Sequence, residues 1–251
     1  MSGRRTVARV RGVRVRDRSG ALVDDVNFDL RAGERLGIAG GRASGTSALA
    51  RALAGQPASG ETVTGGTVEN DGDLCGLAER KWAHLLTGTL EHDELRRALA
   101  QGARAVVVDQ AGARPDATDS AFLRRTFAEH DTPLVLVSDD LALLRQTCDT
   151  VQILLAGRIV ERGPAEELFS RPRHRYLAAL LAGAPERVHA PTGGCAFEPG
   201  CPVGHGRPEC SASFPASRSF PGPTGSVTAK CHHPVPTSSA DPGRADKEHS
   251  R

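Results

Sequence analysis

The segment from residue 35 to residue 54 constrains the fold most, because a strand, a glycine loop and a helix follow one another in it. Arg35–Ala39 is a short apolar run typical of a buried strand, and Ser47–Ala54 has helical periodicity. The loop between them fits the phosphate-binding pattern G-x-x-x-x-G-K-[ST], except at the lysine. Strand, loop and helix in this order direct backbone N–H groups at a phosphate. The candidate binding residues are Gly40, Gly45, Thr46 and Ser47.

The altered residue in this P-loop is Thr46, which occupies the lysine position. Lysine supplies a positive charge that reaches the outer phosphates, whereas threonine offers a hydroxyl without charge. The sequence therefore predicts a nucleotide-binding frame whose chemistry has changed. We expect ATP with Mg²⁺ to bind weakly or not at all.

Strand-like and helix-like segments alternate along most of the chain, which favours an α/β sheet. Ala105–Asp109 is an apolar, β-branched run that ends in an acid, as expected of a central parallel strand. Asp139 or Asp140 is expected to cap the helix that follows them. The other predicted strands cover residues 7–15, 21–30, 65–74, 133–137, 151–155 and 158–160. The predicted helices cover residues 47–54, 76–86, 91–101, 120–130, 140–146, 166–169 and 176–181.

The chain of 251 residues is long enough for one good-sized core with appendages. Its formal net charge of +2 gives no reason to expect nucleic acid as a partner. No apolar run reaches the ~18–20 residues needed to span a bilayer, and the first residues lack the apolar segment of a signal peptide. We expect a cytoplasmic protein, in which six cysteines favour metal, cluster or free thiols over disulfides.

The composition changes near Pro185, where aliphatic residues become rare and Pro, Gly, Ser, His and Cys become frequent. We therefore predict a cassette over residues 1–185, a Cys-rich C-terminal module over 186–234, and a disordered tail over 235–251. Four cysteines in the module could hold a metal, although they lack the close C-x-x-C pair typical of structural zinc. They are Cys195, Cys201, Cys210 and Cys231, with His205, His232 and His233 as alternate ligands. Cys75 and Cys148 are expected to be plain thiols.

Three stretches of the chain resemble the ATPase subunit of an ABC transporter, closest to the oligopeptide, dipeptide and nickel importer group. They are residues 26–47, residues 156–185, and the cysteine pattern from Cys195 to Cys231. The resemblance implies an α/β, P-loop NTPase-like ABC cassette. It also implies a truncated helical subdomain, because residues 56–84 are too few for the family's long insert and its glutamine loop. By the same resemblance, the four cysteines would hold a [4Fe–4S] cluster, for which four thiolates are suited.

The family's catalytic residues are largely replaced when they are carried onto this sequence. Ser47 and Asp109 keep the groups that hold Mg²⁺, although Asp109 could also serve as a strand-end cap. The degenerate positions are Thr46 for the lysine, Gln110 for the glutamate that polarises water, and Asp139 for the switch histidine. Losing a general base costs typically about 10²–10⁴-fold in rate. The signature L-S-G-G falls on Leu85–Gly88, and the adenine-stacking aromatic falls on Arg16.

These residues favour a degenerate, pseudo-ATPase subunit that acts as a non-catalytic partner. Its partner would be an intact ABC ATPase or the membrane subunits of a transporter, and the chain would then be peripheral at the inner face of the membrane. One alternative is an active ATP-hydrolysing subunit of a peptide-type importer, in which Arg42 or a partner supplies the missing charge. The other alternative is a repurposed cytosolic binding or iron–sulfur accessory protein without a transport role.

Overall fold

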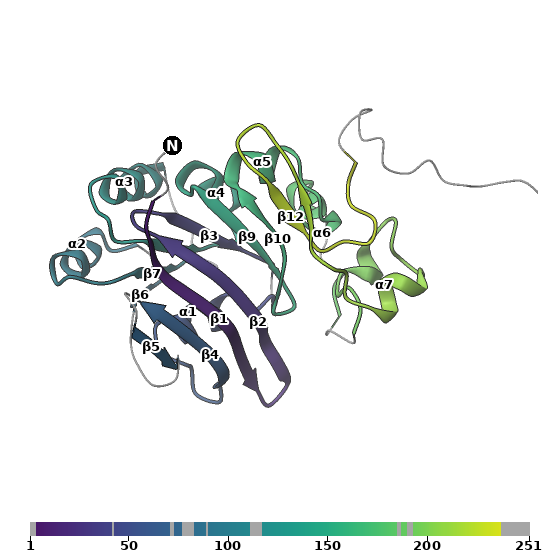
Figure 1. Cartoon of the computed structure of the whole chain (residues 1–251), viewed down its shortest axis with the longest axis horizontal. Helices are drawn as coiled ribbons and strands as arrows, with labels where there is room; N and C mark the ends of the chain where they lie inside the picture. The colour runs from purple at the N-terminus through teal and green to yellow at the C-terminus, as the bar shows by residue number, and fades with distance from the viewer. Residues whose placement is uncertain are drawn as a thin grey trace, which may run out of the picture.

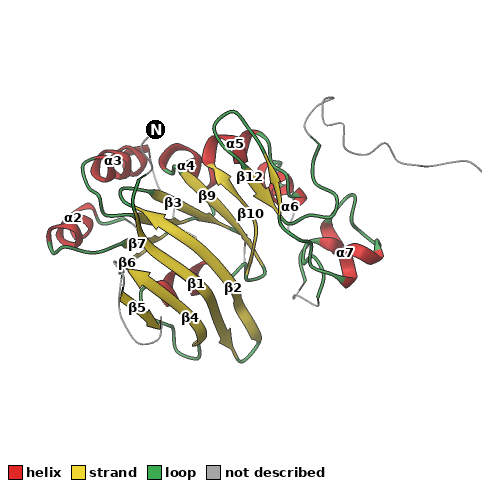
Figure 2. Cartoon of the chain, viewed as in Figure 1, coloured by secondary structure: helices red, strands yellow, loops and turns green. Residues whose placement is uncertain are grey.

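A computed structural model describes residues 4–41, 43–70, 73–76, 83–88, 90–110, 117–184, 187–189 and 193–236. Side chains at positions 70, 73–76 and 117 are not described. Two β-sheets and the helices packed on them form the body of this chain (Figure 1). The helices α2 (His92–Ala100), α3 (Ala117–Ala128), α4 (Leu141–Thr147) and α5 (Ala165–Ser170) line one side of the strands in Figure 2, where helices are red and strands yellow.

The core sheet has the order β11-β12-β10-β9-β3-β8-β7-β6. Its central strands β9, β3, β8, β7 and β6 are parallel, whereas β10, β12 and β11 are joined in antiparallel pairs. The strands are β3 (Arg35–Ala39), β6 (His84–Thr87), β7 (Val106–Asp109), β8 (Leu134–Val137), β9 (Thr150–Leu155), β10 (Arg158–Pro164), β11 (Arg218–Phe220) and β12 (Val227–Ala229).

Both faces of the central strands are buried, so their side chains alternate between two hydrophobic cores. On β8, Val135 and Val137 belong to one core, and Leu134 and Leu136 belong to the other. The first core contains the glycine-loop helix α1 (Thr46–Leu53) and the antiparallel sheet. This alternation explains why the run from residue 134 to residue 137 is apolar at every position.

The antiparallel sheet has the order β2-β1-β4-β5 and covers α1. Its strands are β1 (Thr6–Asp17), β2 (Gly20–Arg31), β4 (Thr62–Asn70) and β5 (Asp73–Gly76). The second core is closed by helices that follow the parallel strands. These and the remaining helices are α2 (His92–Ala100), α3 (Ala117–Ala128), α4 (Leu141–Thr147), α5 (Ala165–Ser170), α6 (Arg175–Leu181), the 3₁₀ turn Glu198–Gly200 and α7 (Pro208–Ala212).

The helix predicted over residues 76–86 is wrong where the structure describes it. Residues 84–87 form strand β6, which pairs in parallel with β7. The segment assigned to the signature therefore lies in a strand beside Asp109, and not at the start of a helix. A short segment with only two apolar residues, Leu85 and Leu86, fits either a strand or a helix, and pairing with a neighbour decides between them.

Residues beyond the predicted boundary at 185 extend the cassette in the structure. Strand β12 pairs with β10, and Ala196, Phe197 and Cys201 share a core with the helices. The boundaries of the module stay a prediction, and residues 237–251 of the predicted tail lie outside the described residues. No helix in the described part of the chain is both long enough and apolar enough to cross a membrane.

The glycine loop is held by two neighbouring elements. The carbonyl oxygen of Ser44 accepts the N–H of Gly157 at 2.8 Å, and the carbonyl oxygen of Gly157 accepts the N–H of Asp24 at 2.9 Å. Gly45 has a φ of 94°, and a Cβ at this residue would overlap the carbonyl oxygen of Leu22 on β2. The loop therefore has no room for a side chain at position 45.

We predict that Gly45→Ala destabilises the protein far more than Gly60→Ala. Both glycines have a positive φ, but a Cβ at Gly60 meets nothing within 4 Å. Left-handed strain costs about 1–2 kcal/mol in either variant, and the overlap with β2 adds about 1–3 kcal/mol at Gly45 alone. Urea unfolding measures both values, and equal free energies of unfolding would show that the loop yields freely.

Candidate functional site

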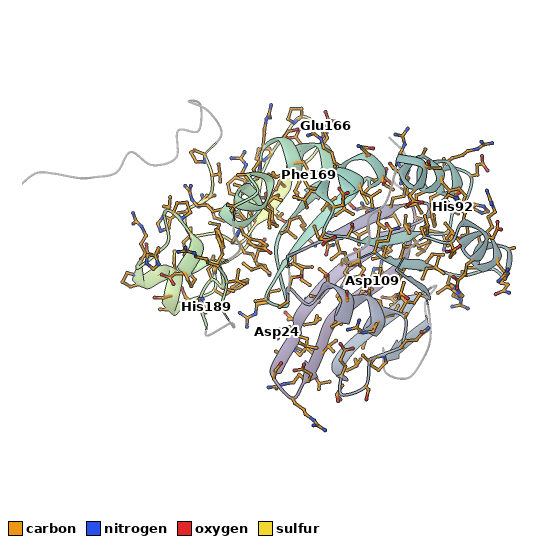
Figure 3. All side chains as sticks on the ribbon, turned by 180° about the vertical axis from the view of Figure 1, so that it is seen from behind. Asp24, His92, Asp109, Glu166, Phe169 and His189 are labelled. Carbon is orange, nitrogen blue, oxygen red and sulfur yellow. The ribbon has the colours of Figure 1, made fainter. Side chains whose placement is uncertain are left out.

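The structure brings the predicted phosphate-site residues together at one edge of the core sheet. The glycine loop follows β3, Gln110 follows β7, and Asp139 follows β8. Strands β3, β8 and β7 are adjacent and parallel, so their carboxyl ends meet at the same edge. In open α/β sheets this edge is where ligands bind. Figure 3 shows Asp109 near the middle of the molecule, whereas His189 lies toward the cysteine-bearing side.

Thr46, the residue in the lysine position, faces inward. Its side chain is 8% exposed, and its Oγ1 lies 3.5 Å from the Oγ of Ser44, which is also buried. The hydroxyl is therefore engaged within the loop. The first turn of α1 has no side-chain cap among the described residues, so the N–H groups next to Ser47 keep the arrangement that favours an anion.

Arg51 is the basic side chain in the last turn of α1, the helix that begins at Thr46. Its Nε donates to Oε2 of Glu61 at 3.0 Å, and its Nη2 pairs with Oε1 of the same carboxylate. This hydrogen-bonded pairing raises the pKa of Arg51, and attraction to Asp109 adds to the effect. The same pairing lowers the pKa of Glu61. Arg51 is thus held by the carboxylate of Glu61 and does not take over the lysine's contact with a phosphate.

Gln110, in the position of the water-polarising glutamate, is fully buried. Its backbone N–H donates to the carbonyl oxygen of Val137 at 2.9 Å. Neither the Oε1 nor the Nε2 of its side chain has a hydrogen-bond partner among the described residues. An amide can orient water but cannot accept a proton from it, so this position lacks a general base.

Asp139 lies beside the glycine loop, where the switch histidine was expected. It is exposed and lines a recess of about 510 Å³ together with Gly40, Gly41 and Arg145. Its carboxylate would repel a phosphate placed there. The next residue, Asp140, caps α4 by accepting the N–H of Leu143 at 2.9 Å, which confirms the predicted cap.

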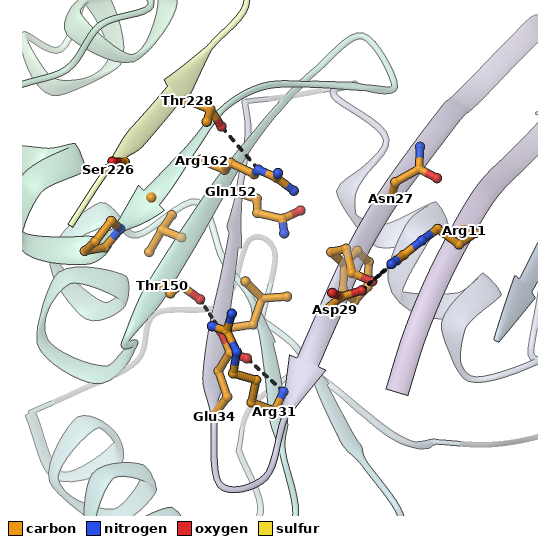
Figure 4. Close-up of a pocket in the computed structure, with 15 residues that line it drawn as sticks. Arg11, Asn27, Asp29, Arg31, Glu34, Thr150, Gln152, Arg162, Ser226 and Thr228 are labelled. Carbon is orange, nitrogen blue, oxygen red and sulfur yellow. Dashed lines mark hydrogen bonds and ion pairs between the residues drawn. The ribbon is translucent and has the colours of Figure 1, made fainter. Parts of the chain in front are cut away.

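A second recess, of about 600 Å³, lies between β2 and the β9–β10 hairpin (Figure 4). Its charged groups are largely paired, with Arg11 bound to Asp29 at 2.5 Å and Thr150 donating to Glu34 at 2.7 Å. None of the predicted site residues lines it. Arg16, the expected replacement for the adenine-stacking aromatic, is exposed on β1.

The four predicted metal ligands line a single cavity. Cys201 and Cys210 are buried, Cys195 and Cys231 are partly buried, and all four are free thiols. A Cβ at Gly204 would lie 3.0 Å from the Sγ of Cys210 and 3.2 Å from the Sγ of Cys201. Glycine therefore keeps the space between these sulfur atoms open.

Burial opposes the charged form of three thiols of this cavity. Burial raises the pKa of Cys195 to about 12 and that of Cys210 to about 11, and it raises the pKa of Cys231 as well. The backbone N–H of Gly204 donates to the Sγ of Cys201 at 3.1 Å. Within the described residues, no three His, Cys, Asp or Glu side chains are close enough to hold one metal ion. The four thiols thus surround a space and do not converge on a point.

Two residues that connect these sites were missed by the sequence analysis. The hydroxyl of Tyr176 accepts the N–H of Gly41 at 2.8 Å, and the Nε2 of His174 lies 3.8 Å from the Sγ of Cys195. Burial lowers the pKa of His174 to about 4, so its ring is neutral at neutral pH. The one available signal was that Tyr176 is the only tyrosine in the chain.

The chain is similar in sequence to ATP-binding proteins of peptide transporters. A probable peptide ABC transporter ATP-binding protein of Sinorhizobium fredii is 30% identical over 185 residues, which cover 65% of this chain and 51% of the relative. The dipeptide transport ATP-binding protein DppD of Escherichia coli is 29% identical over 175 residues, which cover 61% and 52%. The chain thus spans about half the length of these two relatives. No family model matches it.

Solved structures share the fold. CbiO1 of Clostridium perfringens, part of an ABC transporter complex, has a TM-score of 0.52 at 14% identity, covering 66% of this chain and 91% of its own. The ADP conformation of another ABC transporter's ATP-binding cassette has a TM-score of 0.56 at 12% identity, covering 71% and 99%. The chain therefore has the α/β fold of an ABC ATPase cassette, and its sequence relatives are ATP-binding subunits of peptide-type ABC transporters.

We predict that Gln110→Met raises the free energy of unfolding by about 1–3 kcal/mol. Methionine has a similar size and removes a buried amide that has no hydrogen-bond partner within the residues that the structure describes, so its desolvation penalty disappears. Gln110→Glu should lower the same quantity because it buries an unpaired charge. Urea unfolding measures both changes. The control is Gln101→Met at the exposed end of α2, for which a change within about 0.5 kcal/mol is expected; a clear loss of stability in Gln110→Met would contradict the prediction.

Proposed function

We propose that the chain is an ABC-type nucleotide-binding subunit of the peptide-transport kind whose own nucleotide site is degenerate. It acts as a non-catalytic partner of an intact ABC ATPase or of transporter membrane subunits. At the membrane it would be peripheral, on the side of the ATP supply. Its sequence relatives and its cassette fold support the subunit role, and the state of the phosphate site supports the degenerate role.

One observation supports the degenerate site: Thr46, Gln110 and Asp139 stand at the positions of the lysine, the water-polarising glutamate and the switch histidine. The hydroxyl of Thr46 turns toward Ser44, the amide of Gln110 is buried, and Arg51 is bound to Glu61. Asp139 then adds negative charge beside the loop. The lost positive charge and the added negative charge disfavour the binding of a triphosphate. Glutamine at position 110 cannot act as the base that hydrolysis needs.

The residues that remain fit weak binding of a nucleotide. The N–H groups from Gly45 to Ser47 at the start of α1 would contact phosphate oxygens. Ser47 and Asp109 would hold Mg²⁺, which neutralises phosphate charge when it is bound. Arg42, which would supply the missing cation in an active subunit, lies outside the described residues.

The few residues between the P-loop helix and the segment assigned to the signature support a changed mode of assembly. In the transporter ATPases that the sequence resembles, a long helical subdomain in this interval contacts the membrane subunit. Residues 56–84 of this chain are too few for such a subdomain, and they contain the strands β4 and β5. Contact with a membrane subunit would therefore have to use another surface, or be made through the intact ATPase partner.

The cysteine cavity would serve as a second binding site in this subunit. Cys195, Cys201, Cys210 and Cys231 would hold a [4Fe–4S] cluster, which takes four thiolates. Three observations support it: the thiols share one cavity, Gly204 leaves space between two of them, and its N–H donates to a sulfur. Four thiols arranged around a space suit a cluster better than one zinc ion, which needs ligands converging at about 2.3 Å.

The nucleotide site is tested with purified protein and Mg-ATP. We expect turnover at background level, and calorimetry should find a Kd in the millimolar range or no binding. Thr46→Lys should tighten binding about tenfold to hundredfold, because a hydrogen bond to a charged group contributes about 1.5–3 kcal/mol.

Thr46→Met controls for side-chain length without charge, and it should leave binding unchanged. Micromolar binding by the unmodified chain would refute the degenerate site. A Mg-dependent turnover that vanishes in Asp109→Ala would instead support the active subunit.

The cysteine site is tested by anaerobic reconstitution with iron and sulfide. We expect a brown protein with iron and sulfide in equal amounts, and Cys201→Ser should lose the colour because one ligand is gone. Cys148→Ala serves as the control, since Cys148 is buried beside Gly37 away from the cavity. Stoichiometric zinc in colourless protein would make this a zinc site, and protein that retains neither metal would refute it.

A further inference from the structure

Tyr176 connects α6 to the glycine loop. It is 1% exposed, and its hydroxyl oxygen accepts the backbone N–H of Gly41 at 2.8 Å. Gly41 is the second residue of the loop, and its own carbonyl oxygen accepts the N–H of Ser44 at 3.1 Å. The first turn of the loop is therefore fixed in part by a side chain that lies 135 residues later in the sequence.

His174 connects Tyr176 to the cysteine cavity. Its Nδ1 accepts the N–H of Tyr176 at 3.1 Å, and its Nε2 lies 3.8 Å from the Sγ of Cys195. The buried carboxylate of Glu161 accepts the backbone N–H of His174 at 2.9 Å. Because its backbone and one ring nitrogen are held, the imidazole is kept facing Cys195.

The same segment touches the cavity at two further points. The ring of Tyr176 meets the ring of Phe197 edge-on, with centroids 5.4 Å apart, and Phe197 lines the cavity. The Nε of Arg175 donates to the carbonyl oxygen of His233 at 2.8 Å, two residues after Cys231. A change in the positions of the thiols around a bound metal would therefore shift the residues at the start of α6.

The directions of the hydrogen bonds define the chemistry of His174. A neutral imidazole has one acceptor nitrogen and one donor nitrogen. Because Nδ1 accepts from Tyr176, Nε2 carries the hydrogen and presents it to the sulfur of Cys195. Metal binding requires a thiolate, and a charged acceptor strengthens a hydrogen bond. Occupation of the cavity therefore tightens the contact between His174 and Cys195.

We propose that His174 and Tyr176 are positioning residues that couple the cysteine cavity to the glycine loop. A metal centre bound by the cysteines orders the loop, and a phosphate group bound at the loop favours the occupied cavity. The proposal rests on the function proposed above, which supplies both ligands. Coupling between two sites is reciprocal and typically changes each affinity about fivefold to 150-fold.

The test compares protein reconstituted anaerobically with iron and sulfide with the same protein stripped by a chelator. Hydrogen exchange of the backbone amides in residues 40–47 reports the order of the loop without requiring any nucleotide. We expect slower exchange in the loaded protein and Mg-ATP binding that is tighter by at least about fivefold.

Two variants separate coupling from simple structural support. Tyr176→Phe removes only the hydroxyl and keeps the ring against Phe197. His174→Asn keeps an acceptor for the N–H of Tyr176 but lacks the reach to Cys195. Both should abolish the difference in exchange between loaded and stripped protein, while Tyr176→Phe keeps the wild-type iron content and visible spectrum.

Thr147→Val is the matched control. It removes a buried hydroxyl on α4 that lies 3.2 Å from the Oγ of Ser120, away from the path between the two sites. We expect it to lower stability to a similar degree as Tyr176→Phe, and yet to keep the full difference in exchange. Loss of the difference in this control would show that any destabilisation uncouples the sites, which would overturn the specific roles of His174 and Tyr176.

The outcomes distinguish this inference from the proposed function. Equal loop exchange in loaded and stripped wild-type protein overturns the coupling and leaves the metal site standing, and so does a full difference in Tyr176→Phe. A difference in exchange without any binding of Mg-ATP supports the coupling of the loop to the cavity and agrees with the degenerate nucleotide site, whereas micromolar binding by stripped protein refutes that site and leaves the coupling standing. Protein that takes up no iron overturns both the cysteine-site proposal and the coupling.

Discussion

The parallel pairing of β3, β8 and β7 is the constraint on which the rest of the structure depends. It places the end of each strand at one sheet edge, so the glycine loop, Gln110 and Asp139 become neighbours although they are far apart in the sequence. Both faces of these strands must then be covered, which requires α1 and the antiparallel sheet on one side and the later helices on the other. The position of the site follows from the way the core is closed.

The glycine loop keeps its shape without the charge that it usually carries. Its conformation depends on packing against β2 and on hydrogen bonds to the β9–β10 turn and to Tyr176, and none of these contacts involves the lysine position. The fold can therefore lose phosphate chemistry while it retains a phosphate-binding shape. This separation explains how Thr46 can be accommodated by a bond to a neighbouring hydroxyl.

The C-terminal segment contributes to the cassette as well as to the cysteine cavity. Strand β12 extends the core sheet, and Phe197 packs against Tyr176 of α6. A segment with few aliphatic residues is thus stabilised partly by the cassette it joins, and a metal bound in the cavity would add to that stability. Residues of α6 consequently contact both the cavity and the glycine loop.

The sequence by itself determined most strands and helices up to residue 181, the glycine loop, the replaced residues and the four cysteines, because these follow from local periodicity and residue type at short spacing. It gave no sign of β11, β12 or α7 in the C-terminal segment. It mispredicted residues 84–86 as helical, since a segment this short suits a helix or a strand until β7 pairs with it. Tertiary structure alone decided that Arg51 is bound to Glu61, that the buried side chain of Gln110 meets no hydrogen-bond partner in the described part of the chain, and that Tyr176 contacts Gly41. Contacts between residues so distant in the chain leave no local pattern, and only the packed core determines them.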